Sequence, residues 1–317
     1  MKKGRVFWTP LRTTLTAVLL VVIGTIAGFV FLKGYDMPLF FPSGEVGAHE
    51  RDLLVFTMLL SLVVIIPVYS MLIIFSIRYR KNGKYNKKAA YTPEFENSKI
   101  FEAVLWGIPV LLIAILGTVT WVTSHTLDPH RHLDSKVEPI RVQVVTMQWR
   151  WLFIYPDQHV ASMNQLKIPA GTPVNFEITA DAPMSSFWIP ALGTQVYSMA
   201  GMNSKLSLVA DKPGMYRGTN TNINGRGYSS MDFDVVAVGS RSEFNHWVDA
   251  IKERPENNDL TWDLYENLAT PTENSSVVYY TLKDSSLFNM ILNKYMNKDN
   301  SAIDGVKTKE MMQGARG

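Results

Sequence analysis

Three long apolar stretches in the first 125 residues constrain this chain more than any other feature. They run over Thr14–Leu32, Leu53–Ile77 and Phe101–Thr123. Each is long enough to cross a bilayer as a helix, which takes about 20 residues. From about Ser124 onward the composition is that of a water-exposed domain. The sequence therefore predicts a membrane protein that anchors a large outer domain.

Lys and Arg lie mainly on one side of these stretches. Four basic residues precede the first stretch, seven lie within Arg78–Lys99, and only Lys33 and Arg51 flank the connection between the first two. Positive charge near the ends of spans favours the cytoplasmic side. We therefore expect the N-terminus and the loop after the second stretch to be cytoplasmic. The third stretch then delivers the C-terminal domain to the outside.

Residues 1–33 fit two interpretations. They have the basic start and apolar core of a signal peptide, but no clear small-x-small cleavage site follows them. An uncleaved first transmembrane span is the alternative.

Composition excludes several classes of function. The net charge is only +3, and no basic stripe lies outside the loops that flank the spans, so nucleic-acid binding has no electrostatic support. The chain has no cysteine, which rules out disulfides, thiolate metal sites, cysteine nucleophiles and lipidation on cysteine.

The outer domain reads as a β-sandwich or barrel followed by helices. Short apolar or alternating runs separated by Gly, Pro, Asn and Asp clusters predict strands over Ile140–Thr146, Trp149–Tyr155, Gln165–Ile168, Pro173–Thr179, Phe187–Ile189, Lys205–Val209 and Met231–Ala237. Three amphipathic segments then predict helices, the first capped by Ser242.

These patterns divide the chain into five predicted regions. The first, 1–33, is the signal or first span, and 34–124 is a transmembrane hairpin. An antiparallel sandwich over 125–239 and a helical extension over 240–297 follow, and 298–317 is a polar tail predicted to be disordered. The predicted fold class is thus membrane-anchored α+β.

Two groups of titratable residues near the third stretch are candidate sites. Glu102 lies at its cytoplasmic start, where a carboxylate is either functional or simply directed to water. His125, His130 and His132 lie just beyond its other end. They fit either metal ligands or ordinary residues of a polar linker, and no carboxylate or thiolate completes a metal site.

An aromatic run is the most unusual feature of the outer domain. Trp149, Trp151, Phe153 and Tyr155 alternate, so in a single strand they would share one face. They form either a stripe of the sandwich core or an aromatic docking or electron-entry surface.

Several ordered motifs resemble one family. After two apolar spans come QWRWLFIYP, SSFWIPALGTQVYSMAGM and YRGTNTNINGRGYSSM. In this order they are similar to subunit II of the haem-copper respiratory oxidases, over nearly the whole chain from about Phe41. The resemblance implies a cupredoxin-like sandwich for the outer domain.

The resemblance also implies where a binuclear copper centre would lie. In the cytochrome c oxidase branch, two histidines, two bridging cysteines, a glutamate carbonyl and a methionine hold the metal pair. The corresponding residues here are Ser185 and Tyr228, Asn220 and Asn224, Asn222, and Met231. A copper pair needs bridging thiolates and imidazoles, so we expect these vestigial positions not to bind metal.

A subunit II without copper resembles the quinol oxidase branch, and most closely its cytochrome bo-type ubiquinol oxidases. This implies a non-redox subunit of a proton-translocating complex in the bacterial inner membrane. The haem-bearing subunit I, other oxidase subunits and membrane lipid would be its partners. Subunit I would hold the haems and copper and would contact the quinol pool. No soluble cytochrome c would dock, and no cofactor would bind this chain.

The same resemblance bears on the anchor and leaves two alternatives. Glu102 matches the carboxylate at the mouth of a proton-uptake channel. Related subunits often carry a lipidated cysteine after a signal peptide, which this chain lacks. The alternatives are a copper-bearing subunit of a cytochrome c oxidase and a stand-alone membrane-anchored binding module with the same fold.

Overall fold

The computed structural model describes residues 37–79, 98–129, 133, 137–254, 258–273 and 276–296, with six isolated positions between 19 and 30. The first apolar stretch lies almost entirely outside the described residues, as do His130, His132 and the tail beyond residue 296. The chain forms two compact units. One comprises Met1–Phe40 with Arg51–Thr126, and the other comprises Phe41–Glu50 with Leu127–Gly317.

The second and third apolar stretches form long helices. They are α2 (Glu45–Arg78) and α3 (Lys99–Thr126), and both are long and apolar enough to span a bilayer. Pro67 and Pro109 lie inside them, a position that membrane helices tolerate. Within the described part of the chain α3 buries none of its side chains and α2 buries only Gly47. Their apolar surfaces are therefore available to lipid or to a partner protein.

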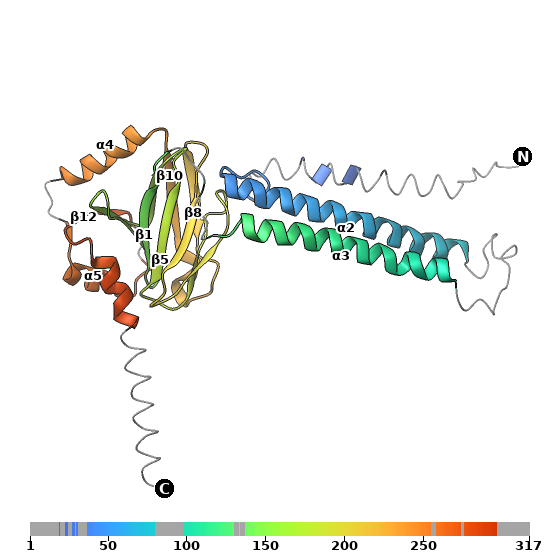
Figure 1. Ribbon diagram of the computed structural model, residues 1–317. Helices are drawn as coiled ribbons and strands as arrows, with labels where there is room; N and C mark the ends of the chain where they lie inside the picture. Colours follow the sequence, from blue (N-terminus) through green and yellow to red (C-terminus); the bar gives the residue numbers. More distant parts are fainter. Residues whose placement is uncertain are drawn as a thin grey trace, which may run out of the picture. The chain divides into compact units, whose positions relative to one another are not determined.

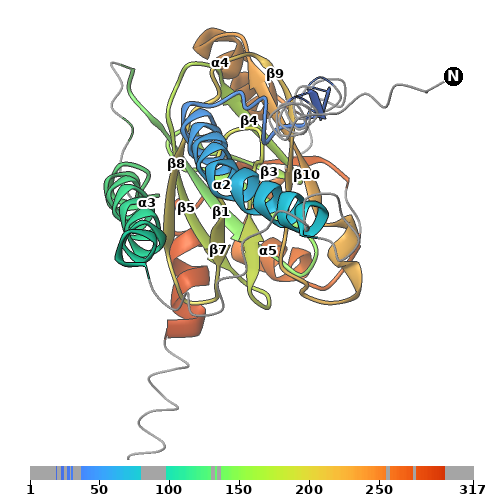
Figure 2. The same ribbon diagram turned by 90° about the vertical axis from the view of Figure 1, so that its right-hand side faces the viewer.

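The outer unit is a β-sandwich (Figures 1 and 2). The larger sheet has the order β11-β12-β3-β2-β1-β5-β8, the smaller has β4-β10-β9, and β6-β7 form a short ribbon. The strands are β1 (Ile140–Thr146), β2 (Trp151–Tyr155), β3 (Val160–Met163), β4 (Gln165–Pro169), β5 (Val174–Ala180), β6 (Ser185–Phe187), β7 (Val196–Ser198), β8 (Ser204–Leu208), β9 (Gly214–Thr219), β10 (Asp232–Val238), β11 (Asp259–Leu260) and β12 (Val278–Leu282).

The sandwich is mixed rather than purely antiparallel. β1 pairs parallel with β5, and β4 pairs parallel with β10. β2 and β3 extend the larger sheet on one side of β1, and β4 crosses to the smaller sheet. The chain then returns as β5 on the free side of β1, in the same direction. This corrects the expected antiparallel pairing at these two places.

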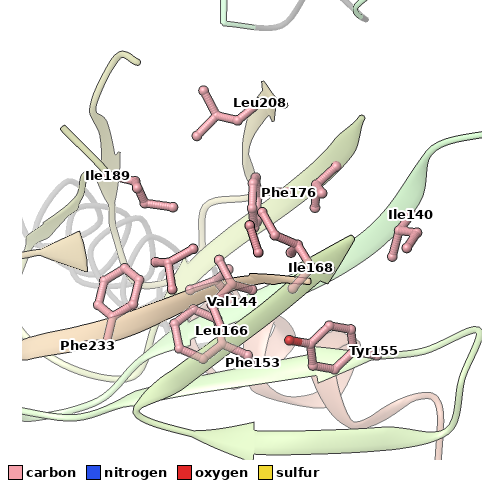
Figure 3. Close-up of a cluster of buried hydrophobic side chains, with 14 of the residues drawn as sticks. Ile140, Val144, Phe153, Tyr155, Leu166, Ile168, Phe176, Ile189, Leu208 and Phe233 are labelled. Carbon is pink, nitrogen blue, oxygen red and sulfur yellow. The ribbon is translucent and has the colours of Figure 1, made fainter. Parts of the chain in front are cut away.

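The main core lies between the two sheets. It is lined by inward-facing residues of both sheets, among them Val144, Phe153, Phe176 and Phe233 (Figure 3). Phe187 stacks on Phe233, with ring centroids 5.4 Å apart. Alternation along a strand sends every second side chain to this side, and the apolar area removed from water there drives the sheets together.

A second core explains why β2 is apolar at every position. Trp151, Phe153 and Tyr155 face the main core, whereas Leu152 and Ile154 join a cluster with Tyr265, Phe288 and Ile291 of the extension. A strand covered on both faces has no polar side. The C-terminal extension therefore covers the outer face of the larger sheet.

The extension contains the three predicted helices and two strands that were not predicted. The helices are α4 (Arg241–Lys252), α5 (Trp262–Leu268) and a segment over 287–296. β11 and β12 join the larger sheet, so the extension is not purely helical. The cap of α4 is Ser240 rather than Ser242. Its side chain accepts from Glu243 N (3.2 Å), while the Glu243 carboxylate accepts from Gly239 N (3.0 Å), one residue before the cap. This pair resembles a capping box but is shifted by one residue.

The segment Phe41–Glu50 is built into the sandwich unit. Ser43 N donates to Ala191 O (2.7 Å), Gly47 N to Leu192 O (3.0 Å) and Asp211 N to Ser43 O (2.8 Å). Gly44 lies so close that a Cβ there would be 2.6 Å from Val209 O. The residues just before α2 and in its first turn thus pack backbone to backbone against two loops of the sandwich.

Candidate functional site

The positions that the family resemblance aligns with a copper site gather at the start of β6 and in the loop after β9. Asn224 Nδ2 donates to Ser185 Oγ (2.8 Å) and to Met231 Sδ (3.3 Å). Asn220 Nδ2 donates to Met231 Sδ (3.4 Å). Ser185, Asn220, Asn224 and Met231 are all buried. Four positions that lie up to 46 residues apart in the sequence therefore form one hydrogen-bonded cluster.

The other two positions contribute mainly through the backbone. Asn222 O accepts from Asn220 Nδ2 (2.8 Å), and the Asn222 side chain donates to Met184 O (3.0 Å). Tyr228 lies in the 3₁₀ helix η2 (Arg226–Ser230), and its carbonyl oxygen accepts a hydrogen bond from Met231 N (3.2 Å). They hold the loop in shape.

This donor set does not fit a copper pair. The chain offers no thiolate to bridge two metal ions. Both amides direct N–H groups at the Met231 sulfur, so the lone pairs of the thioether already meet hydrogen-bond donors. The described residues also contain no group of three or more His, Cys, Asp or Glu side chains that could hold a metal ion.

The aromatic run is split by a sharp bend. β2 begins at Trp151, and Trp149 lies before it with φ of 72°, so the expected strand over Trp149–Tyr155 is two residues too long. Trp151, Phe153 and Tyr155 are fully buried. Trp149 leaves the shared face because a left-handed backbone redirects its side chain, a conformation that is unusual for a bulky residue.

The Trp149 indole packs on the loop that carries the vestigial positions. It is half-buried and contacts Gly225 and Gly227. A Cβ at Gly227 would lie 2.5 Å from Trp149 Cγ. Gly225 has φ of 125°, which side chains other than glycine rarely adopt. The NINGRGY sequence thus needs glycine both for a backbone bend and for room beneath an indole.

The two candidate groups in the anchor lie at opposite ends of α3. Glu102 is exposed in the first turn, and its backbone N–H donates to Ser98 O (2.9 Å). His125 is in the last turn, with its Nδ1 2.7 Å from Trp121 O. The other two members of the expected histidine cluster, His130 and His132, lie outside the described residues.

The structure adds two buried polar contacts to the extension that sequence reasoning missed. Asp181, after β5, accepts hydrogen bonds from Tyr265 (2.7 Å), Lys294 (3.0 Å) and Tyr295. Arg150 donates to the carbonyl oxygens of Leu268 and Thr270 at the end of α5. The partners lie 84 to 120 residues away, so no local pattern could have revealed them.

The pKa of Asp181 reflects this environment. Burial of the carboxyl raises its pKa, but hydrogen bonds from Tyr295, Tyr265 and Lys294 outweigh burial and leave the pKa below the usual value for an aspartate. Burial and the neighbouring Asp181 raise the pKa of Tyr265. The carboxylate is therefore ionised and the phenols are neutral donors at neutral pH.

Two family models match the outer unit. Residues 158–238 match the cytochrome c oxidase subunit II periplasmic domain, and residues 254–299 match the COX aromatic-rich motif. The first match covers the sandwich strands from β3 through β10, and the second covers most of the extension.

Three curated relatives are similar over most of the chain. Cytochrome bo(3) ubiquinol oxidase subunit 2 of Pseudomonas aeruginosa is 44% identical over 86% of this chain and 80% of its own length. The protein of the same name from Pseudomonas putida is 41% identical over 90% and 89%. Ubiquinol oxidase subunit 2 of Acetobacter aceti is 39% identical over 87% and 88%.

Proposed function

The chain belongs to the family of ubiquinol oxidase subunit 2 proteins, and on this premise we propose that it is the subunit without a redox centre in a proton-translocating quinol oxidase. The complex would oxidise quinol and reduce oxygen to water, using haems and copper held in subunit I. The observation that carries this proposal is the cluster of amides around Met231, where a copper-bearing subunit would need thiolates.

The role of the chain would be to pack on the catalytic subunit. Exposed apolar side chains support this: α2 and α3 bury none of their described apolar side chains, and many are more than half exposed. On the sandwich, Ile223 is 83% exposed, and Met184 and Tyr197 are about half exposed on adjoining segments. No charged residue occurs in 182–187, 195–204 or 218–225. A neutral surface with apolar side chains suits a permanent protein contact.

Co-purification of haem tests this assembly. A tagged chain, solubilised in mild detergent, should carry haem and quinol oxidase activity with it. If the intact chain purified alone from membranes that contain active oxidase, the proposal would fail, and the stand-alone binding module would be favoured.

A matched pair of variants tests the proposed contact surface. Ile223→Lys should reduce the haem that co-purifies with the chain, because it places a charge in a neutral contact. Met215→Lys is the control, since Met215 is 73% exposed on β9, at the edge of the smaller sheet. Equal haem recovery for both variants would place the contact elsewhere.

The arrangement in the membrane follows from the same proposal. The two candidate spans and the match to a periplasmic-domain model indicate a membrane-anchored protein with a periplasmic domain. We place the chain in the inner membrane with both helices crossing it. The start of α3 would then face the cytoplasm, where Glu102 could admit protons to the catalytic subunit.

A copper-bearing subunit of a cytochrome c oxidase is the remaining alternative. Metal analysis of the sandwich unit, released from its anchor, distinguishes the two. We expect no stoichiometric copper after incubation with copper salts. Bound copper in a one-to-one or higher ratio would overturn the assignment to the quinol oxidase branch.

A further inference from the structure

Met231 is buried to 1% exposure at the point where three segments of the sandwich meet. Its sulfur lies 3.4 Å from Asn220 Nδ2 and 3.3 Å from Asn224 Nδ2. A thioether is a weak acceptor. Without the sulfur, however, each of the two side-chain amides would have a buried N–H group that lacks this acceptor. Loss of a buried partner costs more than the hydrogen bond itself contributes.

The backbone of Met231 is held as firmly as its side chain. Its N–H donates to Tyr228 O (3.2 Å), and its carbonyl accepts from the indole N–H of Trp151 (3.2 Å). Trp151 belongs to the main core. The residue thus connects the rigid centre of the sandwich to the loop after β9.

The amides that bond to the sulfur also fasten that loop to β6. Asn220 Oδ1 accepts from Ser186 N (2.9 Å) and Asn222 N (3.0 Å). Asn224 Nδ2 donates to Ser185 Oγ (2.8 Å). Both ends of the segment 220–224 are therefore tied to the same sulfur and to the same strand.

We infer that Met231 is the hub of a metal-free clasp that fixes the loop 220–225 and, through it, positions the Trp149 indole. The side chain of Trp149 lies on Gly225 and Gly227, directly after the clasped segment. Its left-handed backbone, with φ of 72°, is unfavourable for a bulky residue and persists only if its surroundings hold it.

The simpler explanation is that Met231 only fills space in the core. Met163 provides the comparison, because it is equally buried, at 2%, in the second cluster. No hydrogen bond to its sulfur occurs among the described residues of the chain. Met→Leu conserves volume and removes the sulfur, so the two substitutions differ mainly in the amides that lose an acceptor.

Hydrogen–deuterium exchange on the full-length chain, purified with its complex, tests the clasp. Met231→Leu should speed exchange of the amides in 220–228 by about tenfold, equivalent to about 1.4 kcal/mol of local opening, and should leave α5 and β12 unchanged. Met163→Leu should leave 220–228 unchanged. Equal protection of 220–228 in both variants and in the parent would show that the sulfur only fills space.

A double-substitution cycle tests the bond itself. Asn224→Leu removes one donor and keeps a side chain of similar shape. Met231→Leu should then lower the midpoint of thermal unfolding less than it does in the parent, because fewer donors lose their acceptor. An equal shift in both backgrounds would overturn the clasp, whatever the size of that shift.

Discussion

The indole of Trp149 lies directly on the α carbon of Gly227, and a Cβ on that glycine would sit 2.5 Å from Trp149 Cγ. Gly227 is buried, and the tryptophan is held at φ of 72°. Two residues 78 positions apart in the sequence thus require each other, one by its size and the other by its lack of a side chain.

Gly227→Ala should destabilise the outer unit by about 1–3 kcal/mol, because overpacking moves the indole or the loop. Thermal unfolding followed by tryptophan fluorescence measures both effects. Gly214→Ala is the control, since the nearest atom to a Cβ there is 3.7 Å away on Tyr216. If Gly227→Ala had the same thermal stability as Gly214→Ala, the loop would be able to move away from the indole at no cost in free energy.

Asp181→Asn should weaken the attachment of the extension by about 2 kcal/mol at pH 7, because hydrogen bonds to a charged acceptor contribute about 1.5–3 kcal/mol each. Burial alone would raise the pKa of Asp181, but Tyr295, Tyr265 and Lys294 hold it below its usual value. A depressed folded-state pKa stabilises the fold above the unfolded-state pKa, about 3.9.

The contribution of Asp181 is then lost as the pH falls through the lower folded-state pKa. Unfolding measured from pH 7 down to pH 2 should therefore show a smaller loss of stability below about pH 4 for Asp181→Asn than for the parent. Asp234→Asn, at an exposed position of β10, is the control, and its free energy of unfolding should fall with pH as that of the parent does. If the free energy of unfolding of Asp181→Asn fell with pH as steeply as that of the parent, the proposed stabilising role of the Asp181 carboxylate would be wrong.

Gly44→Ala should loosen the segment Phe41–Glu50 from the sandwich, because the new Cβ would meet Val209 O at 2.6 Å and Leu192 O at 2.7 Å. Both atoms belong to the backbone and cannot rotate away. We expect a loss of about 1–3 kcal/mol and faster exchange of the Ser43 and Gly47 amides. Protection equal to that of Gly214→Ala would mean that this contact yields without cost.

Glu102→Gln should slow turnover of the assembled oxidase by about tenfold, equivalent to about 1.4 kcal/mol in the barrier, and should slow reduction of the haems. The reason is that an amide at the proposed entry point cannot carry a proton. Asp52→Asn, a carboxylate near the start of α2, is the control. Unchanged turnover and unchanged haem reduction in Glu102→Gln would remove Glu102 from proton entry.

The anchor and the positions of the main strands along the chain could be predicted because they depend on local patterns. Length and apolarity identify α2 and α3, since a lipid environment leaves the backbone no partner except itself. Alternation and turn residues identify β1, β4, β5, β8 and β10. The expectation that the positions corresponding to a copper site bind no metal rests on the family resemblance together with residue types, because asparagine and serine cannot replace thiolates.

Tertiary structure alone decided how these elements meet. β12 joins the larger sheet beside β3, and α5 covers the face of β2 that Leu152 and Ile154 present. Asp181 and Arg150 hold this extension through partners far along the chain. The bend at Trp149, the glycines beneath it and the amide clasp on Met231 are likewise set by long-range packing. Local sequence determines which backbone conformations are favourable. Burial and pairing between distant segments determine which of these conformations the chain adopts.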